Sequence, residues 1–301
     1  MNVSRFQKRK HLDVAPAREG HKGLRKGVYV VPSLFTAMNI LAGFYSLMAT
    51  MSGFRLLGLG DVSGAAGRFD YAAMAIGWAF VCDTLDGRIA RMTRSTTEIG
   101  IQLDSLADVV SFGLAPAILV YSWGYGTALQ DWVNVRQLAW FLSFMYVICG
   151  GFRLARFNVQ ATRPRPLAEG TPKVDKKSFV GLPIPVAGCL IAAIIHFAPT
   201  PLRYAPRAEV LAILTMVLVA FLSILMVSTI RFTSFKSVGA GRRLSARTVI
   251  AFIALAGLIY LFSQWILLAL VITYIVHGLL SRGLAPLFRR SDAQSGEVRK
   301  I

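Results

Sequence analysis

Cysteine is scarce in this chain, and its three thiols follow no pairing pattern. Cys82, Cys149 and Cys189 all lie inside apolar stretches, and none belongs to a CxxC motif. Zinc sites and redox motifs need such spacing, so we predict neither a structural zinc site nor a disulfide and interpret the three as small core residues. The first 27 residues also lack a short apolar segment followed by a small-residue cleavage site, which argues against a secretory signal.

Charged residues are scarce as well. They make up 16% of the 301 residues, whereas 55% are hydrophobic. A soluble domain carries roughly a quarter charged residues. The mean hydropathy is +0.56, and several apolar runs reach about 20 residues, the length that crosses the hydrocarbon core of a bilayer. The composition therefore predicts a membrane protein.

Basic residues outnumber acidic ones. The chain has 33 Lys and Arg and 15 Asp and Glu, which gives a formal net charge of +18. The basic residues lie between and beyond the apolar runs rather than on one amphipathic face. This distribution favours membrane orientation over nucleic-acid binding, and it indicates anionic membrane lipids as the electrostatic partner.

We predict an all-α fold, a polytopic membrane helix bundle with about eight transmembrane helices. The expected spans cover about 28–52, 70–92, 100–123, 137–160, 179–198, 209–230, 247–263 and 264–281. Between them, Lys and Arg concentrate in alternate loops and in both tails. We therefore expect a multi-pass protein of the cell (inner) membrane with both termini in the cytoplasm.

The two tails differ from the rest of the chain. Residues 1–27 and 282–301 are polar and basic and show no apolar periodicity, so we expect cytoplasmic tails that are disordered or lie on the membrane surface. Residues 28–281 are expected to form one transmembrane domain.

Four aspartates stand within or at the edge of apolar helices, which is an expensive arrangement. Asp83 and Asp86 are three residues apart, and Asp104 and Asp108 are four apart, so each pair projects from one face of its helix. The short link around residues 94–98 makes the two helices antiparallel neighbours, so all four carboxylates can meet near the cytoplasmic interface.

Clustered carboxylates repel one another unless a cation lies among them. Ligation by carboxylates without His or Cys suits Mg²⁺, Mn²⁺ or Ca²⁺, and two such ions about 3.5 to 4 Å apart are a common device for phosphoryl transfer. The small residues Gly87, Ala90 and Gly100 leave room for a diphosphate or a neighbouring helix, and Arg91 is placed to meet phosphate charge.

Three other interpretations remain open at this point. An Asp pair near a helix end can simply be a cap, and small residues in a membrane helix often serve packing. Intramembrane carboxylates also bind ions in cation transporters, although there they lie near the midplane. A purely scaffolding protein is the weakest alternative because four clustered acids are so costly.

The run from Asp83 to Asp108 reads D-x2-D-G-x2-A-R-x8-G-x3-D-x3-D. This matches the signature of the CDP-alcohol phosphatidyltransferases, and the chain resembles that family. The resemblance implies a homodimer with a six-helix catalytic core that moves a phosphatidyl group from CDP-diacylglycerol to an alcohol and releases CMP. It implies two Mg²⁺ or Mn²⁺ ions. The implied roles are metal binding by Asp83, Asp86, Asp104 and Asp108, general base catalysis by Asp108, and binding of the CDP moiety by Gly87, Ala90, Arg91, Gly100 and, on the first helix, Asn39.

The motif does not identify the acceptor alcohol. Segments beginning at Pro32, Asp104, Gly150 and Ser178 resemble the bacterial integral-membrane branch of the family, whose acceptor is L-serine. Arg153 and Arg156 lie three apart at the end of the fourth span, where either could bind the serine carboxylate or simply anchor the helix at the headgroups. Glycerol 3-phosphate, inositol phosphate and choline remain alternative acceptors.

Several polar residues outside the motif are lesser candidates. Thr36 lies near Asn39 in the first span, and Asn158, Ser111 and Ser178 are polar groups near the expected site. We interpret His196 and His277 as interfacial residues without partners. Pro183 and Pro185 are expected to kink the start of the fifth span.

Overall fold

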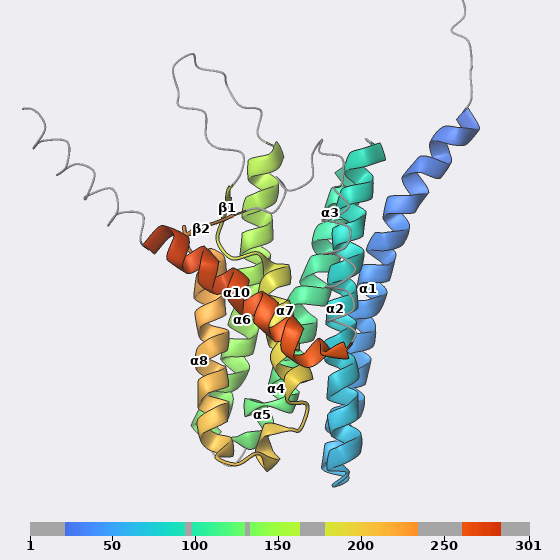
Figure 1. The fold of residues 1–301 in the computed structure, drawn as a ribbon. Coiled ribbons are helices and arrows are strands. Elements are labelled where there is room, and N and C mark those ends of the chain that lie inside the picture. The colour runs from blue at the N-terminus through green and yellow to red at the C-terminus, as the bar shows by residue number, and fades with distance from the viewer. Residues whose placement is uncertain (1–21, 94–97, 130–132, 163–177, 234–260, 284–301) are drawn as a thin grey trace, which may run out of the picture.

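The computed structural model describes residues 22–93, 98–129, 133–162, 178–233 and 261–283. Most helices in this part of the chain stand side by side in one bundle, and α10 crosses the bundle obliquely (Figure 1). Five of the helices are long and apolar enough to cross a membrane. The prediction of an all-α polytopic membrane bundle is therefore confirmed.

The first two helices form a long hairpin. α1 spans Lys22–Gly58 and α2 spans Val62–Thr93. Gly60 takes a positive φ of 83° in the turn between them, a conformation that favours glycine. Asp61 then caps α2, because its Oδ1 accepts a hydrogen bond of 2.8 Å from the backbone N–H of Gly64.

The third segment is one continuous rod with a π-helical turn in the middle. α3 spans Glu98–Asp108, the π-helix η1 spans Val109–Leu114, and α4 spans Ala115–Trp123. A short helix, α5 (Tyr125–Ala128), follows. Hydropathy predicts the rod but contains no signal for the π turn.

The remaining elements complete the bundle. They are α6 (Val133–Thr162), α7 (Ile184–Phe197), the 3-10 turn η2 (Leu202–Tyr204), α8 (Ala208–Val227) and α10 (Ser263–Gly283). Two short strands, β1 (Ser178–Val180) and β2 (Arg231–Thr233), pair antiparallel with Phe179 opposite Phe232. They join the approach to α7 with the chain that leaves α8.

The structure corrects the expected start of the fifth span. Residues 178–180 form a strand, and α7 begins only at Ile184, with Pro183 as its N-cap and Pro185 in its first turn. Proline is tolerated there because the first turn of a helix has no intrahelical partner for its N–H. The prolines therefore start the helix rather than kink it.

The expected count of eight spans is not confirmed. The five helices with sufficient length and hydropathy cover Leu34–Gly58, Ile99–Ala128, Val133–Val159, Ile184–Tyr204 and Ala208–Val227. The expected second span lies within α2, which does not meet this criterion. α10 has only a shorter apolar stretch, Ser263–Gly278. The expected seventh span falls mostly outside the described residues.

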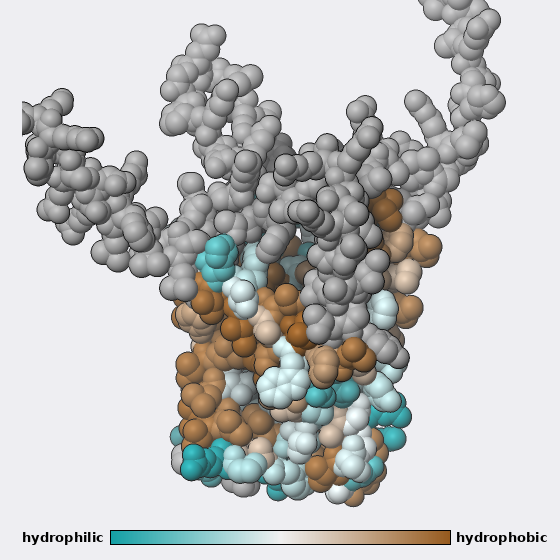
Figure 2. Space-filling model, in the orientation of Figure 1, coloured by the Kyte–Doolittle hydropathy of each residue, from teal (hydrophilic) through white to brown (hydrophobic). Residues whose placement is uncertain are grey.

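The surface of the bundle is apolar where a soluble protein would be polar. Large side chains such as Trp78 and Ile224 are 65% and 67% exposed. Figure 2 shows hydrophobic residues over much of the bundle and hydrophilic residues gathered at its lower edge. A surface of this kind matches the hydrocarbon of a bilayer rather than water.

The inward face of α2 leads directly to the acidic motif. Small and apolar residues at helical spacing are buried along it, namely Ala65, Phe69, Ala72, Ile76 and Ala79. Continued at the same spacing, this face reaches Asp83 and Asp86. The period that packs α2 into the bundle therefore also turns its acids toward the interior.

Candidate active site

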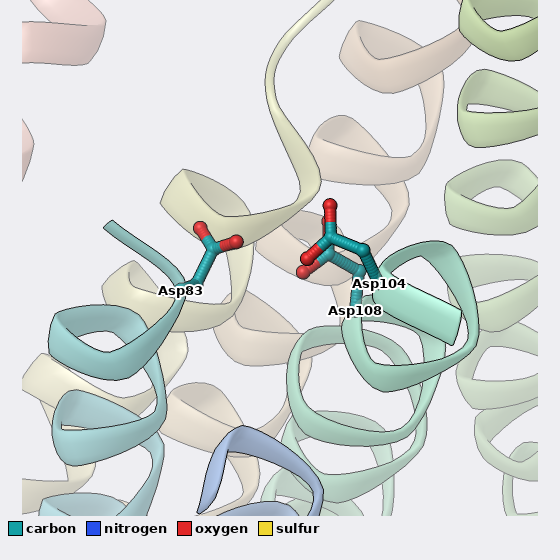
Figure 3. A group of neighbouring side chains, drawn as sticks. All are labelled: Asp83, Asp104 and Asp108. Atoms are coloured by element: carbon teal, nitrogen blue, oxygen red, sulfur yellow. The ribbon is translucent and has the colours of Figure 1, made fainter. Parts of the chain in front are cut away.

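Three of the four predicted acids meet between α2 and α3. One carboxylate oxygen from each of Asp83, Asp104 and Asp108 lies within 4.8 Å of the other two. Figure 3 shows Asp83 approaching from α2, with Asp104 and Asp108 facing it from successive turns of α3. Asp108 is buried, and the other two are half-buried. Of the four acids expected to meet, the structure therefore brings three, from both helices, to a common point.

Asp86 is not one of this group of three. Its side chain is buried, and its carboxylate accepts a hydrogen bond from the hydroxyl of Thr36 on α1. The same α2 face therefore presents Asp83 to α3 and joins Asp86 to α1.

Asp108 is the most enclosed of the three clustered acids. Its carboxylate faces those of Asp83 and Asp104, the guanidinium of Arg153 on α6, and the amide of Asn39 on α1. Negative charge dominates this environment, since Arg153 alone contributes a compensating cation among these groups. A further cation would relieve the repulsion between the carboxylates.

Buried polar atoms without partners surround the same point. Oδ1 of Asp108, Nε of Arg153 and both side-chain polar atoms of Asn39 have no hydrogen-bond partner among the described residues. Leaving such an atom buried and unpaired costs about 1–3 kcal/mol. Carboxylate oxygens are the donors that hard divalent cations prefer. The three acids thus fit a divalent metal ion, and the neighbouring polar atoms fit a polar ligand.

The π turn after Asp108 is held from three sides. The Ser111 hydroxyl donates to the Asn39 carbonyl at 2.9 Å, which ties η1 to α1. The Tyr146 hydroxyl donates to the Phe112 carbonyl at 3.0 Å, which ties η1 to α6. Gly188 of α7 lets its helix approach closely, because a Cβ there would lie 3.1 Å from the Phe112 backbone.

π turns within α-helices are frequent at functional sites, and this one begins one residue after Asp108. Its contacts fix the direction of the helix that carries Asp104 and Asp108. Tyr146 is an isolated Tyr in an apolar span, and no pattern in the sequence distinguishes it.

The two arginines of α6 lie in different surroundings. Arg153 is half-buried beside Asp108 and Asp83, whereas Arg156 is exposed. Near the end of α6, the Asn158 amide donates a hydrogen bond of 2.9 Å to the Ser105 hydroxyl and joins α6 to α3. The structure therefore brings Arg153, and not Arg156, to the acidic cluster.

The residues expected at the CDP moiety are only partly described. Asn39 is fully buried near Asp108, and Gly87 and Gly100 are half-buried on α2 and α3. Ala90 and Arg91 belong to α2, but their side chains lie outside the described residues. Their contact with a nucleotide stays a prediction.

One expectation about histidine is wrong. His196 was expected to lack partners, but its Nδ1 lies 2.5 Å from Oδ1 of Asp70 and its Nε2 lies 2.9 Å from the Ser263 hydroxyl. These contacts join α7 to α2 and α10, at a sequence separation that no local pattern reveals. His277 is exposed.

Comparison with known proteins gives consistent matches. The family model for CDP-alcohol phosphatidyltransferase matches residues 29–217. The chain is 34% identical over 212 residues to the CDP-diacylglycerol--serine O-phosphatidyltransferase of Helicobacter pylori, covering 70% of this chain and 75% of that protein. It is 32% identical over 212 residues to the archaetidylserine synthase of Methanothermobacter thermautotrophicus, covering 70% of this chain and 72% of that protein. A Saccharomyces cerevisiae protein with the same name as the Helicobacter protein is 34% identical over 179 residues, 59% of this chain and 57% of its own length.

Proposed function

The chain belongs to the CDP-alcohol phosphatidyltransferase family, and from this premise we propose that it transfers a phosphatidyl group from CDP-diacylglycerol to L-serine. The oxygen of the serine hydroxyl attacks the phosphorus that carries diacylglycerol. The bond from this phosphorus to the CMP oxygen breaks, and CMP leaves with the electron pair. The products are phosphatidylserine and CMP. The names of the relatives support serine as the acceptor.

We assign the proton transfer to Asp108. It is the most buried acid of the cluster, and one of its carboxylate oxygens has no hydrogen-bond partner among the described residues. A carboxylate in this position can accept the proton of the attacking hydroxyl. The meeting of Asp83, Asp104 and Asp108 within 4.8 Å is the observation that carries the proposal. Direct attack is favoured because none of the fixed positions of the motif is a Ser, Cys or His that could serve as an obvious nucleophile.

The acids would hold divalent cations, Mg²⁺ or Mn²⁺ and two in number, with Asp83, Asp86, Asp104 and Asp108 as ligands. When bound, such ions supply positive charge to the diphosphate and to the departing CMP. The acids have fixed positions on α2 and α3, so they would hold the ions and the substrate in a fixed orientation. Thr36 holds the Asp86 carboxylate through a hydrogen bond. We further propose that Gly87, Ala90, Arg91, Gly100 and Asn39 bind the CDP moiety.

Arg153 is our candidate for the serine carboxylate. It is half-buried at the cluster, and its Nε has no hydrogen-bond partner among the described residues. A guanidinium is well suited to binding a carboxylate. A phosphorylated acceptor would favour a denser group of cations. Arg156 is exposed, and Lys173, Lys176 and Lys177 lie outside the described residues.

The setting of the reaction is also a proposal. We infer a homodimer in the inner membrane, with residues 28–281 as the catalytic domain, both tails in the cytoplasm and anionic lipids at the basic surfaces. The concentration of Lys and Arg in alternate loops and tails supports this orientation. It would give the acidic cluster access to water-soluble serine and release CMP into the cytoplasm.

An acceptor comparison tests the function. Purified protein in detergent receives CDP-diacylglycerol, Mn²⁺ or Mg²⁺, and one alcohol at a time, and both CMP and the lipid product are measured. We expect product with L-serine and none with glycerol 3-phosphate, inositol phosphate or choline. Product with another alcohol alone would retain the chemistry and overturn the acceptor. No CMP with any alcohol would contradict the enzymatic proposal.

A further inference from the structure

α6 contacts the rod that carries Asp108 at two points. Near the end of α6, the Asn158 amide donates a hydrogen bond of 2.9 Å to the Ser105 hydroxyl of α3. Earlier in α6, the Tyr146 hydroxyl donates to the Phe112 carbonyl of η1 at 3.0 Å. Because α3 continues directly into η1, one of these contacts precedes Asp108 along the rod and the other follows it. α6 thus holds the rod on both sides of Asp108.

Both partners of the contact between α6 and α3 are oriented by their own helices. The Ser105 hydroxyl donates to the Ile101 carbonyl at 3.0 Å, which leaves its oxygen lone pairs to accept the bond from Asn158. Asn158 lies one turn after the buried core residue Leu154 and therefore on the same face of α6. Ser105 and Asn158 are half-buried, so their hydrogen bond is partly shielded from water.

Ser105 flanks the acidic face of α3. An α-helix turns by about 100° per residue, so Ser105 lies about 60° around the axis from Asp108 and about 100° from Asp104. Both acids face Asp83 of α2 (Figure 3), and one oxygen from each of the three carboxylates lies within 4.8 Å of the other two. α3 thus turns its acids to α2 and the neighbouring flank to α6. A rotation of α3 about its axis would change both contacts together.

We propose that Asn158 is a positioning residue of the metal site and acts through Ser105. The hydrogen bond fixes the rotation of α3, and with it the direction in which Asp104 and Asp108 face Asp83. The inference rests on the metal site of the proposed function. Without this bond, the contact between α6 and η1 remains, but it lies beyond both acids of α3. The start of α3 can then turn, which spreads the carboxylates over more orientations and weakens their hold on a cation.

The test is Asn158→Leu, which keeps the approximate size of the side chain and removes the amide. Purified protein in detergent is titrated with Mn²⁺, and two concentrations are measured. One gives half-maximal formation of phosphatidylserine, and the other gives half of the rise in the thermal unfolding midpoint without substrates. Loss of one neutral hydrogen bond predicts that both concentrations rise about fivefold. At saturating Mn²⁺, kcat should return to within about twofold of its value for the unmodified protein.

Ser105→Ala removes the acceptor of the same hydrogen bond and should raise both Mn²⁺ concentrations by the same factor. The double variant should match either single variant, because each change breaks one shared bond. Ser52→Ala is the matched control. Ser52 is half-buried on α1, and its hydroxyl donates to the Met48 carbonyl of its own helix at 2.9 Å, as Ser105 does to Ile101. This variant should leave both concentrations unchanged.

Unchanged Mn²⁺ concentrations in Asn158→Leu, additive effects in the double variant, or an equal effect of Ser52→Ala would overturn the inference. A lower unfolding midpoint without Mn²⁺, combined with unchanged Mn²⁺ concentrations, would show that Asn158 serves the fold alone. If the unmodified protein forms phosphatidylserine, each of these results leaves the proposed function intact. If it forms none, the proposed function fails and the unfolding titration decides the inference. If Mn²⁺ neither activates nor stabilises the unmodified protein, both fail.

Discussion

Thr36 donates a hydrogen bond from its hydroxyl to the buried carboxylate of Asp86, and this contact joins the first helix to the acidic motif of the second. The contact spans 50 positions of the sequence. It has a direct consequence, because a buried carboxylate that loses a donor becomes free to reorient toward the other acids of the site.

Replacement of Thr36 by Val keeps the shape of the side chain and removes its hydroxyl. We expect kcat to fall on the order of tenfold, since hydrogen bonds to charged groups are worth about 1.5–3 kcal/mol. Thr50→Val is the matched control: Thr50 is also buried on α1, but its hydroxyl donates only to the Ser46 carbonyl of its own helix. Equal loss in both variants would argue that Thr36 serves the helix rather than Asp86.

Metal dependence should follow the group of three acids. Removal of divalent ions with a chelator should abolish CMP release, and added Mn²⁺ should restore it. Asp83→Asn replaces a charged ligand with a neutral amide, so we expect at least a tenfold rise in the Mn²⁺ concentration that gives half-maximal activity. The same variant with an unchanged Mn²⁺ requirement would remove Asp83 from the metal site.

The close contact between α1 and the π turn should be sensitive to one added methyl group. A Cβ at Gly43 would lie 2.4 Å from Oγ and 2.9 Å from Cα of Ser111. Gly43→Ala should therefore destabilise the protein by about 1–3 kcal/mol, because the two segments must separate. Thermal unfolding in detergent measures the change.

Gly77→Ala is the control for that experiment. Gly77 lies within α2 and has no neighbouring atom within 4 Å of the position that a Cβ would take. Alanine favours a helix over glycine, so this variant should be neutral or slightly more stable. A loss of stability equal to that of Gly43→Ala would show that the contact with Ser111 is not the cause.

The contact between Ser263, at the start of α10, and His196 yields a separate prediction. Ser263→Ala removes the hydroxyl that contacts His196 and should speed hydrogen exchange along α10 more than along α8. Unchanged hydrogen exchange along α10 would show that the contact between Ser263 and His196 does not hold this helix.

The spacing of residues within one helix predicts which side chains of the site share a helix face. The intervals between Asp83 and Asp86, and between Asp104 and Asp108, place each pair on an inward face, and the short link brings the two helices together. Spacing cannot predict how each carboxylate is partnered. It does not distinguish Asp86, which bonds to Thr36, from Asp83, which joins the acids of α3.

Features that depend on distant contacts are not predictable from local patterns. The π turn after Asp108 is supported by Tyr146 and Gly188, which belong to other helices. His196 reaches Ser263 only because α10 packs beside α7. The start of α7 was expected too early because hydropathy does not distinguish a short apolar strand from a helix.

The most direct test of the account is the stoichiometry of the serine reaction and its dependence on Asp108. Purified protein is incubated with CDP-diacylglycerol, Mn²⁺ and labelled L-serine, and CMP and labelled lipid are counted together. We expect one CMP for each phosphatidylserine, a loss of at least 100-fold in kcat for Asp108→Asn, and full activity for Glu209→Gln, which alters an exposed acid at the start of α8. CMP release without labelled lipid, or an Asp108→Asn variant as active as the unmodified protein, would contradict the account.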